Sequence, residues 1–209
     1  MNIVLINDDG YKSPSSNSLM DFLKKNNHSI YCFFPKDDCS SCSGQIHINQ
    51  RISIEQITPY KYIVGGTPVD CLHTAISYLR KKGIPVDLVI SGVNSGLNYG
   101  STVMYSGTIF AALEAGLFSI PSIAVSAHKL VINNLSDFKK TLKVITEVIS
   151  FIEKFPLIDR TLNINFFPNC FDENNKRVAI FENKVVDHKY ILPSIDVNDI
   201  GKKSIQMCF

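Results

Sequence analysis

Short runs of branched apolar residues recur along the chain, and amphipathic segments separate them. Met1 to Asn7 is the clearest run: it is almost wholly apolar and ends in polar residues, which is typical of a buried strand. Such a strand has both faces covered, so its apolar residues need not alternate with polar ones. Strands are expected at 1–7, 29–34, 87–91, 122–126 and 162–167, with a weaker strand or hairpin over 51–64 and a weaker strand at 177–181.

Apolar residues at helical spacing predict the intervening helices. The helix at 67–82 has the most complete signals, because Thr67 suits an N-cap, Pro68 the first helical position and Asp70 the first turn. Gly83 suits the end of this helix. The other helices are expected at 17–26, 107–117 (with Ser106 as cap) and 136–154, and residues 36–50 and about 92–105 are expected to be loops.

Strands that alternate with helices predict an α/β fold with a mostly parallel sheet and helices on both faces, hence three layers. The chain of 209 residues contains no recognisable linker, so we expect a single domain over 1–209. In open α/β sheets, ligands bind outside the carboxyl ends of the strands. The residues that follow each strand are therefore the candidates for chemistry.

Two adjacent carboxylates, Asp8 and Asp9, follow the first predicted strand. Like charges side by side repel one another, and a bound cation removes that repulsion. Asn94 and Asn98 follow the strand at 87–91 and should lie at the same edge. Carboxylate, amide and hydroxyl oxygens suit a hard ion such as Mg²⁺ or Mn²⁺. The alternative is that the two aspartates only cap a helix or form a turn with Gly10.

A candidate anion site lies at Ser106, Gly107 and Thr108, where a helix is expected to begin. Free backbone N–H groups and the helix dipole favour an anion there, and a glycine allows close approach. An ordinary serine N-cap is the alternative. Beside a cation, the same segment would serve as a phosphate site.

Composition narrows the classes of function. The net charge of +2 and the lack of a dense Lys/Arg block argue against a nucleic acid duplex or an anionic membrane as partner. No segment reaches the roughly 18 apolar residues of a membrane span, and none reads as a signal peptide, so a cytoplasmic protein is expected.

The cysteines and histidines carry weaker signals. Cys39 and Cys42 form a CxxC pair that keeps a redox function open, but no second pair supports a structural zinc site. His47, in the polar loop, is interpreted as a solvated residue, with a role in lining a site or as a general acid left open.

Several motifs in order resemble the SurE (survival protein E) family. They are Ile3 to Gly10, the Ser-rich loop after Pro35, Gly66 to Cys71, Ser91 to Asn98, and Tyr105 to Thr108 running into an Ala-rich helix. Each motif is moderately specific, whereas five in the right order are strong evidence. The resemblance covers about 1–168.

This resemblance implies a Rossmann-like core and a metal-dependent phosphatase that acts on nucleoside 5′- and 3′-monophosphates, assembled as a dimer or tetramer. Asp8 and Asp9 would be catalytic and would bind one Mg²⁺ or Mn²⁺ per subunit together with Asn94. A loop serine would be the fourth ligand, at Ser40 by position, with Ser41 left open. The phosphate site would comprise Asn98, Ser106, Gly107 and Thr108.

The chain also departs from the family pattern. Ser15 stands where the family usually has glycine, and Cys39 and Cys42 occupy a loop that usually carries arginine. Residues 169–209 are shorter than the family's C-terminal region, so a reduced extension and a homodimer are expected. Rival functions are a nucleotide-binding module without turnover, a thiol protein that uses Cys39 and Cys42, and, more remotely, a glycosyltransferase.

Overall fold

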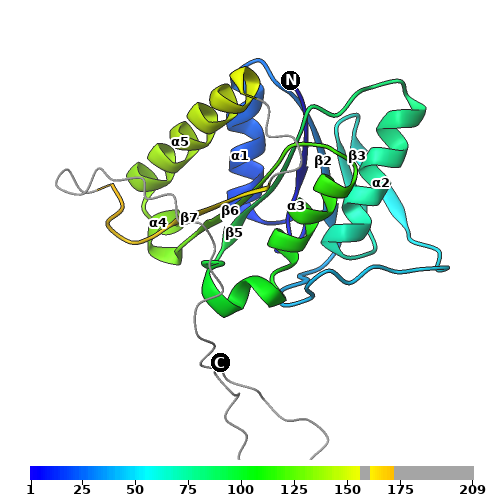
Figure 1. Cartoon of the computed structure of the whole chain (residues 1–209), viewed down its shortest axis with the longest axis horizontal. Coiled ribbons are helices and arrows are strands. Elements are labelled where there is room, and N and C mark those ends of the chain that lie inside the picture. The colour runs from blue at the N-terminus through cyan, green and yellow to red at the C-terminus, as the bar shows by residue number, and fades with distance from the viewer. Residues whose placement is uncertain (156–160, 172–209) are drawn as a thin grey trace, which may run out of the picture.

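A computed structural model describes residues 1–155 and 161–171 as a three-layer α/β structure (Figure 1). The strands are β1 Asn2–Ile6, β2 Ser29–Pro35, β3 Ile54–Thr58, β4 Lys61–Val64, β5 Leu88–Ser95, β6 Ser122–Ala127 and β7 Thr161–Phe166. The helices are α1 Pro14–Lys25, α2 Pro68–Lys81, α3 Gly107–Leu117, α4 Lys129–Asn133 and α5 Leu135–Lys154, with a 3₁₀ helix, η1, at Gly100–Tyr105.

The strands of this part of the chain form one sheet in the order β3-β4-β2-β1-β5-β6-β7. Only β3 runs antiparallel to its neighbour, and the other pairings are parallel. Without β3, the six parallel strands have the 3-2-1-4-5-6 order of the Rossmann fold. The predicted α/β fold is confirmed, and the strand order reverses direction between β1 and β5.

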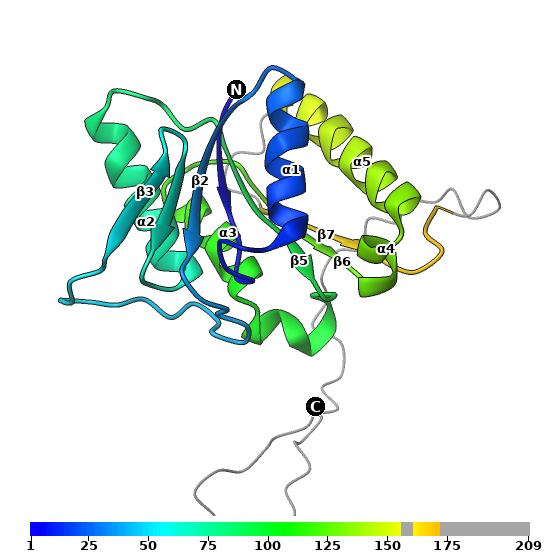
Figure 2. The ribbon, with the colours of Figure 1, turned by 180° about the vertical axis from the view of Figure 1, so that it is seen from behind.

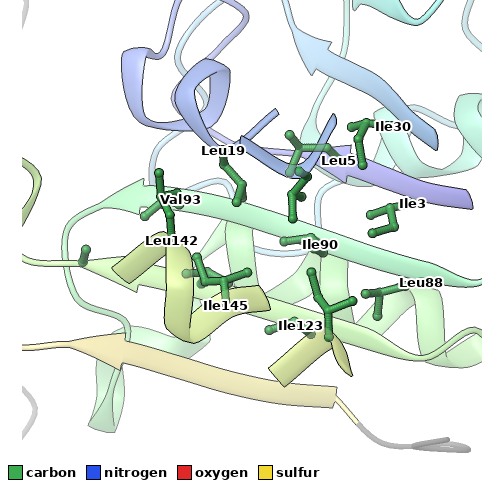
Figure 3. Close-up of a cluster of buried hydrophobic side chains, with 14 of the residues drawn as sticks. Ile3, Leu5, Leu19, Ile30, Leu88, Ile90, Val93, Ile123, Leu142 and Ile145 are labelled. Carbon is green, nitrogen blue, oxygen red and sulfur yellow. The ribbon is translucent and has the colours of Figure 1, made fainter. Parts of the chain in front are cut away.

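The sheet separates two apolar clusters, and β1 contributes to both. Ile3 and Leu5 pack with α1 and α5 on one face, as Figure 3 shows, whereas Val4 and Ile6 pack with α2 and α3 on the other. Figures 1 and 2 show these two helix pairs on opposite sides of the sheet. The alternation continues past the strand: Asn7 contacts Ser16 of α1, whereas Asp8 contacts Thr108 of α3.

The start of α2 is the local prediction that the structure bears out most fully. The Thr67 hydroxyl accepts from the Asp70 N–H, and Asp70 Oδ2 accepts from the Thr67 N–H at 2.8 Å, which makes a capping box. The expected hairpin over 51–64 is β3 and β4. No helix within 1–155 and 161–171 is long and apolar enough to cross a bilayer.

The structure differs from the sequence predictions in several places. Helix α1 begins at Pro14 rather than 17, because Ser13 caps it and its first turn buries serines instead of apolar residues. Strand β5 continues to Ser95 instead of ending at 91, since pairing with β6 resumes at Asn94 after an irregularity. Part of the expected loop at 92–105 is η1, and the short helix α4 was not predicted.

Three predictions lie wholly or partly outside the described residues. The strand at 177–181 falls within 172–209, so it stays a prediction. The same holds for the single domain over 1–209 and for the reduced extension over 169–209.

Gly92 lies in the irregular part of β5, two residues before Asn94. It has a φ of +133°, and an added Cβ would collide with the carbonyl oxygen of Val125. We expect Gly92→Ala to lower the free energy of unfolding by about 2 kcal/mol or more, because both backbone strain and overlap oppose it.

Chemical denaturation measures this loss, and Gly116→Ala is the matched control. A Cβ on Gly116, in α3, meets nothing within 4 Å, so this variant should be neutral or slightly stabilising. Equal stability of the two variants would contradict the role assigned to Gly92.

Candidate active site

The candidate residues gather at the carboxyl ends of β1 and β5, where the strand order reverses. Asp8 and Asp9 follow β1, and Asn94 belongs to the last residues of β5. The N-terminus of α3 approaches from one face, since Thr108 hydrogen bonds to Asp8. The loop after β2 and η1 lie at the same edge (Figure 2). This is the position at which open α/β sheets bind ligands.

Asp8 is the more enclosed of the two carboxylates, with 4% of its surface exposed. The Thr108 hydroxyl donates to Oδ1 at 2.7 Å, and the Thr108 N–H donates to Oδ2 at 3.1 Å. Burial raises the pKa of Asp8 above its ordinary value, and the bonds from Thr108 only partly offset that. Asp8 is thus oriented by the N-terminus of α3.

Asp9 is more open than Asp8. Its Oδ2 accepts from the Ser95 N–H at 3.3 Å, which ties it to the end of β5. Burial and then the charge of Asp8 raise the pKa of Asp9 to about 6. Asp9 is therefore poised to bind a proton or a cation near neutral pH.

Asn94 has its amide fixed by the backbone. Its Nδ2 donates to the Gly96 carbonyl at 2.8 Å, which leaves Oδ1 as the group available to a ligand. Ser15 contacts the residue before Asn94, because its hydroxyl donates to the Val93 carbonyl at 2.6 Å. Ser15 thus links α1 to the irregular part of β5.

The loop after β2 is held against Asp8 by its backbone. The Cys39 N–H donates to the Asp8 carbonyl at 2.8 Å. Ser40, the next residue, is exposed, and its N–H and hydroxyl both donate to Asp38 Oδ1, at 2.8 and 2.6 Å. Ser41 is also exposed and has a φ of +62°. The choice between these serines as a ligand stays a prediction.

Three of the candidate phosphate residues, Ser106, Gly107 and Thr108, lie at the start of α3, and the fourth, Asn98, follows β5. Ser106 caps α3 through a bond from the Ile109 N–H, and Gly107 lies so close to Asp8 that an added Cβ would be 3.2 Å from the Asp8 Cβ. Thr108 uses both of its donors on Asp8.

Asn98 is also tied down. It is 7% exposed, donates through Nδ2 to Ser126 at 2.8 Å, and accepts at its carbonyl from Asn163 and Asn165. The two asparagines of β7 support the site, but the sequence pattern gave them no such role. Their position in β7, which pairs with β6, is the feature from which this role could have been predicted.

The donors fit a hard cation. Within the described ranges no group of three or more His, Cys, Asp or Glu side chains is arranged to hold a metal. The candidate set has two carboxylates, so it depends on the Asn94 amide oxygen and a serine hydroxyl to complete it. Two adjacent carboxylates with raised pKa values indicate a site that a cation would stabilise.

The thiols of the loop do not have the properties of redox cysteines. Cys39 and Cys42 are free, and burial raises the pKa of both, that of Cys42 to about 12. A reactive cysteine needs a lowered pKa, because the thiolate is the nucleophile. At neutral pH both side chains are neutral thiols.

His47 is not the solvated residue that the sequence suggested. Its Nδ1 lies 2.6 Å from Asp70 Oδ2, and its backbone N–H donates to Asp70 Oδ1 at 3.0 Å. The partners are 23 residues apart, and nothing in the local sequence marks the pair.

Comparisons with known proteins agree with this geometry. A family model described as survival protein SurE matches residues 3–188. The chain is 34% identical over 214 residues to a "5′-nucleotidase SurE" of Clostridium botulinum strain 657, covering 99% of this chain and 82% of that protein. The chain belongs to the SurE family.

Two further SurE proteins support the assignment. A "5′-nucleotidase SurE" of Clostridium beijerinckii is 34% identical over 186 residues, covering 86% of this chain and 72% of the relative. The crystal structure of the SurE protein from Aquifex aeolicus has a TM-score of 0.71 at 30% identity, covering 80% of this chain and 66% of that one. All the candidate site residues fall inside the range that the SurE model matches.

Asp9 makes the stability of the metal-free chain depend on pH. A carboxyl group whose folded-state pKa is raised lowers the free energy of unfolding as pH rises from about 4 through 6. The pKa of Asp9, about 6, places its contribution in that window. We expect the melting temperature in EDTA to fall there, and Asp9→Asn to remove part of the fall. Asp21→Asn, at an exposed position of α1, is the control.

Proposed function

We propose that this member of the SurE family is a divalent-metal-dependent phosphatase that hydrolyses nucleoside 5′-monophosphates, and also 3′-monophosphates, to nucleoside and phosphate. The observation that carries the proposal is the adjacent pair Asp8 and Asp9 at the reversal of strand order, with Asp8 oriented by the start of α3. The Clostridium relatives are named 5′-nucleotidases, which supports the substrate class.

Asp8, Asp9, Asn94 and Ser40 would hold one Mg²⁺ or Mn²⁺ per subunit. When bound, such an ion supplies positive charge to a phosphoryl oxygen and lowers the pKa of a bound water. A homodimer and a cytoplasmic location are retained from the sequence as expectations of the same proposal.

The other side chains of the site would have separate roles in the reaction. Thr108 keeps the Asp8 carboxylate in one orientation, so that group acts as a fixed ligand. Asp9 is more open than Asp8, so its carboxylate would orient or deprotonate the attacking water. At the start of α3 the N–H groups of Thr108 and Ile109 are bonded to Asp8 and Ser106. The Gly107 N–H, with Asn98, would therefore face the phosphoryl oxygens and stabilise the charge that develops there.

Two rival functions can be weighed against the geometry. The raised pKa values of Cys39 and Cys42 disfavour a thiol-based activity. A binding module without turnover has the same fold and the same carboxylates, so only an assay of turnover separates it from the phosphatase.

Phosphate release is the direct test. We expect release from nucleoside monophosphates with Mg²⁺ or Mn²⁺, none with EDTA, and a loss of about 100-fold or more in kcat for Asp8→Asn and Asp9→Asn, since each removes a ligand or base. Asp21→Asn, on the exposed side of α1, is the matched control. Tight nucleotide binding without release from any ester would favour the binding module instead.

The two loop serines give a sharper test of the ligand set. The Cys39 N–H is bonded to the Asp8 carbonyl, and Ser40 directly follows Cys39. The Ser40 hydroxyl is therefore one residue nearer in sequence to this bond than the Ser41 hydroxyl. We expect Ser40→Ala to raise the metal concentration for half-maximal activity about tenfold or more, and Ser41→Ala to change it little. Titration of activity with Mn²⁺ measures both, and the reverse order would assign the ligand to Ser41.

A further inference from the structure

A cavity of about 520 Å³ lies beside the proposed phosphate site. Its walls come from the segments that follow β2 and β4, including Lys36, His47 and Gly66. These segments lie at the carboxyl edge of the sheet, where this fold binds ligands. A smaller cavity, of about 370 Å³, is bordered by Gly83–Val86 and Ile120, which precede β5 and β6 and therefore lie at the opposite edge.

The larger cavity adjoins the candidate active site through two cysteines. Cys39 lines the cavity and is bonded through its N–H to the Asp8 carbonyl. Cys42 also lines it, and a Cβ on Gly107 would lie 2.7 Å from the Cys42 Sγ and 3.2 Å from the Asp8 Cβ. A ligand with its phosphate at the start of α3 could therefore extend past these thiols into the cavity.

Beyond the thiols, His47 is a hydrogen-bonding group held in a fixed orientation. Asp70, only 2% exposed, accepts from the His47 backbone N–H and from the Thr67 N–H. Burial alone would raise the pKa of Asp70, but the bonds from His47 and Thr67 outweigh it and lower the pKa. The carboxylate is an acceptor, so the Nδ1 of His47, 2.6 Å away, carries the proton.

Among the described residues, Nδ1 of His47 has Asp70 as its partner, and Nε2 has no hydrogen-bond partner. The side chain lines the cavity and is 29% exposed, with Nδ1 already engaged. In the neutral ring Nε2 has a lone pair and accepts a hydrogen bond. The common nucleobases present N–H donors on their edges, whereas the thiols nearer Asp8 offer only weak hydrogen bonds.

We propose that this cavity receives the nucleoside part of the substrate and that His47, held by Asp70, is a specificity-determining residue that accepts a hydrogen bond from the base. The proposal rests on the proposed function and adds to it the residue that distinguishes a nucleotide from a smaller phosphate ester. The ribose would lie against Cys39 and Cys42, and the base would reach His47. A volume of about 520 Å³ lies within the range of cavities that bind small molecules.

The test compares two esters with the same kind of leaving group. Adenosine 5′-monophosphate and ribose 5-phosphate both release a primary alcohol, but only the first carries a base. We expect His47→Ala to lower the ratio of their kcat/KM values about 10- to 100-fold, mainly through KM for the nucleotide, because a base N–H would lose its acceptor. His47→Gln, whose amide oxygen can accept, should restore part of the ratio.

His73→Ala is the matched control, because His73 pairs with Glu114 at 2.9 Å and is not among the residues that line the cavity. It should leave the ratio as in the wild type. A second probe, purine riboside 5′-monophosphate, lacks an N–H on the base, and its kcat/KM should differ little between wild type and His47→Ala.

Two outcomes would overturn the proposal. An equal fall in kcat for both esters would make His47 part of the catalytic machinery, and an unaltered ratio would remove it from substrate recognition. Calorimetric binding of adenosine to the full chain and to His47→Ala gives a readout that needs no turnover. If no ester is hydrolysed, the proposed function fails. Equal adenosine binding by the two proteins, or no binding by either, would independently contradict the assignment of this cavity to the nucleoside.

Discussion

The burial of Asp8 against the first turn of α3 is the interaction around which the site is organised. Its carboxylate accepts both donors of Thr108, and its carbonyl accepts the Cys39 N–H. One residue thus joins the end of β1, the start of α3 and the loop after β2. The end of β5 lies beside this residue as well, because β5 pairs with β1 where the strand order reverses.

This arrangement has an electrostatic cost. Asp8 is buried and Asp9 adjoins it, and the pKa of each is raised. Charged groups in such surroundings are stabilised by an opposite charge, which the described residues do not supply at hydrogen-bond distance from either carboxylate. A divalent cation held as proposed would resolve the conflict, and the irregular passage of β5 through Gly92 brings Asn94 to the same edge. The fold and the proposed chemistry therefore depend on the same few contacts.

Much of the framework could be predicted from local patterns. The apolar run of β1 and the capping signals of α2 are short-range features, so the sequence alone located them. The end of β5 was missed because Gly92, Asn94 and Ser95 have the composition of a loop, and only pairing with β6 makes them a strand. Helix α1 was predicted too short because its first turn buries serines rather than apolar side chains.

The candidate site was predictable in its location more than in its contacts. The position of Asp8 and Asp9 after a buried strand was enough to bring them to the ligand-binding edge. Thr108 was expected at a phosphate, yet its donors are bonded to Asp8, a contact between residues 100 positions apart. The pairing of His47 with Asp70 is likewise long-range, and it depends on the path of a loop that has no regular pattern.

Asp8 and Asp9 are proposed to hold one divalent cation, and anomalous diffraction from crystals of the full chain soaked in Mn²⁺ tests this most directly. We expect one anomalous peak per subunit, about 2.0–2.4 Å from oxygens of Asp8, Asp9 and Asn94. A peak at the thiols of Cys39 and Cys42, or no peak between Asp8 and Asp9 in Mn²⁺-saturated crystals, would contradict it.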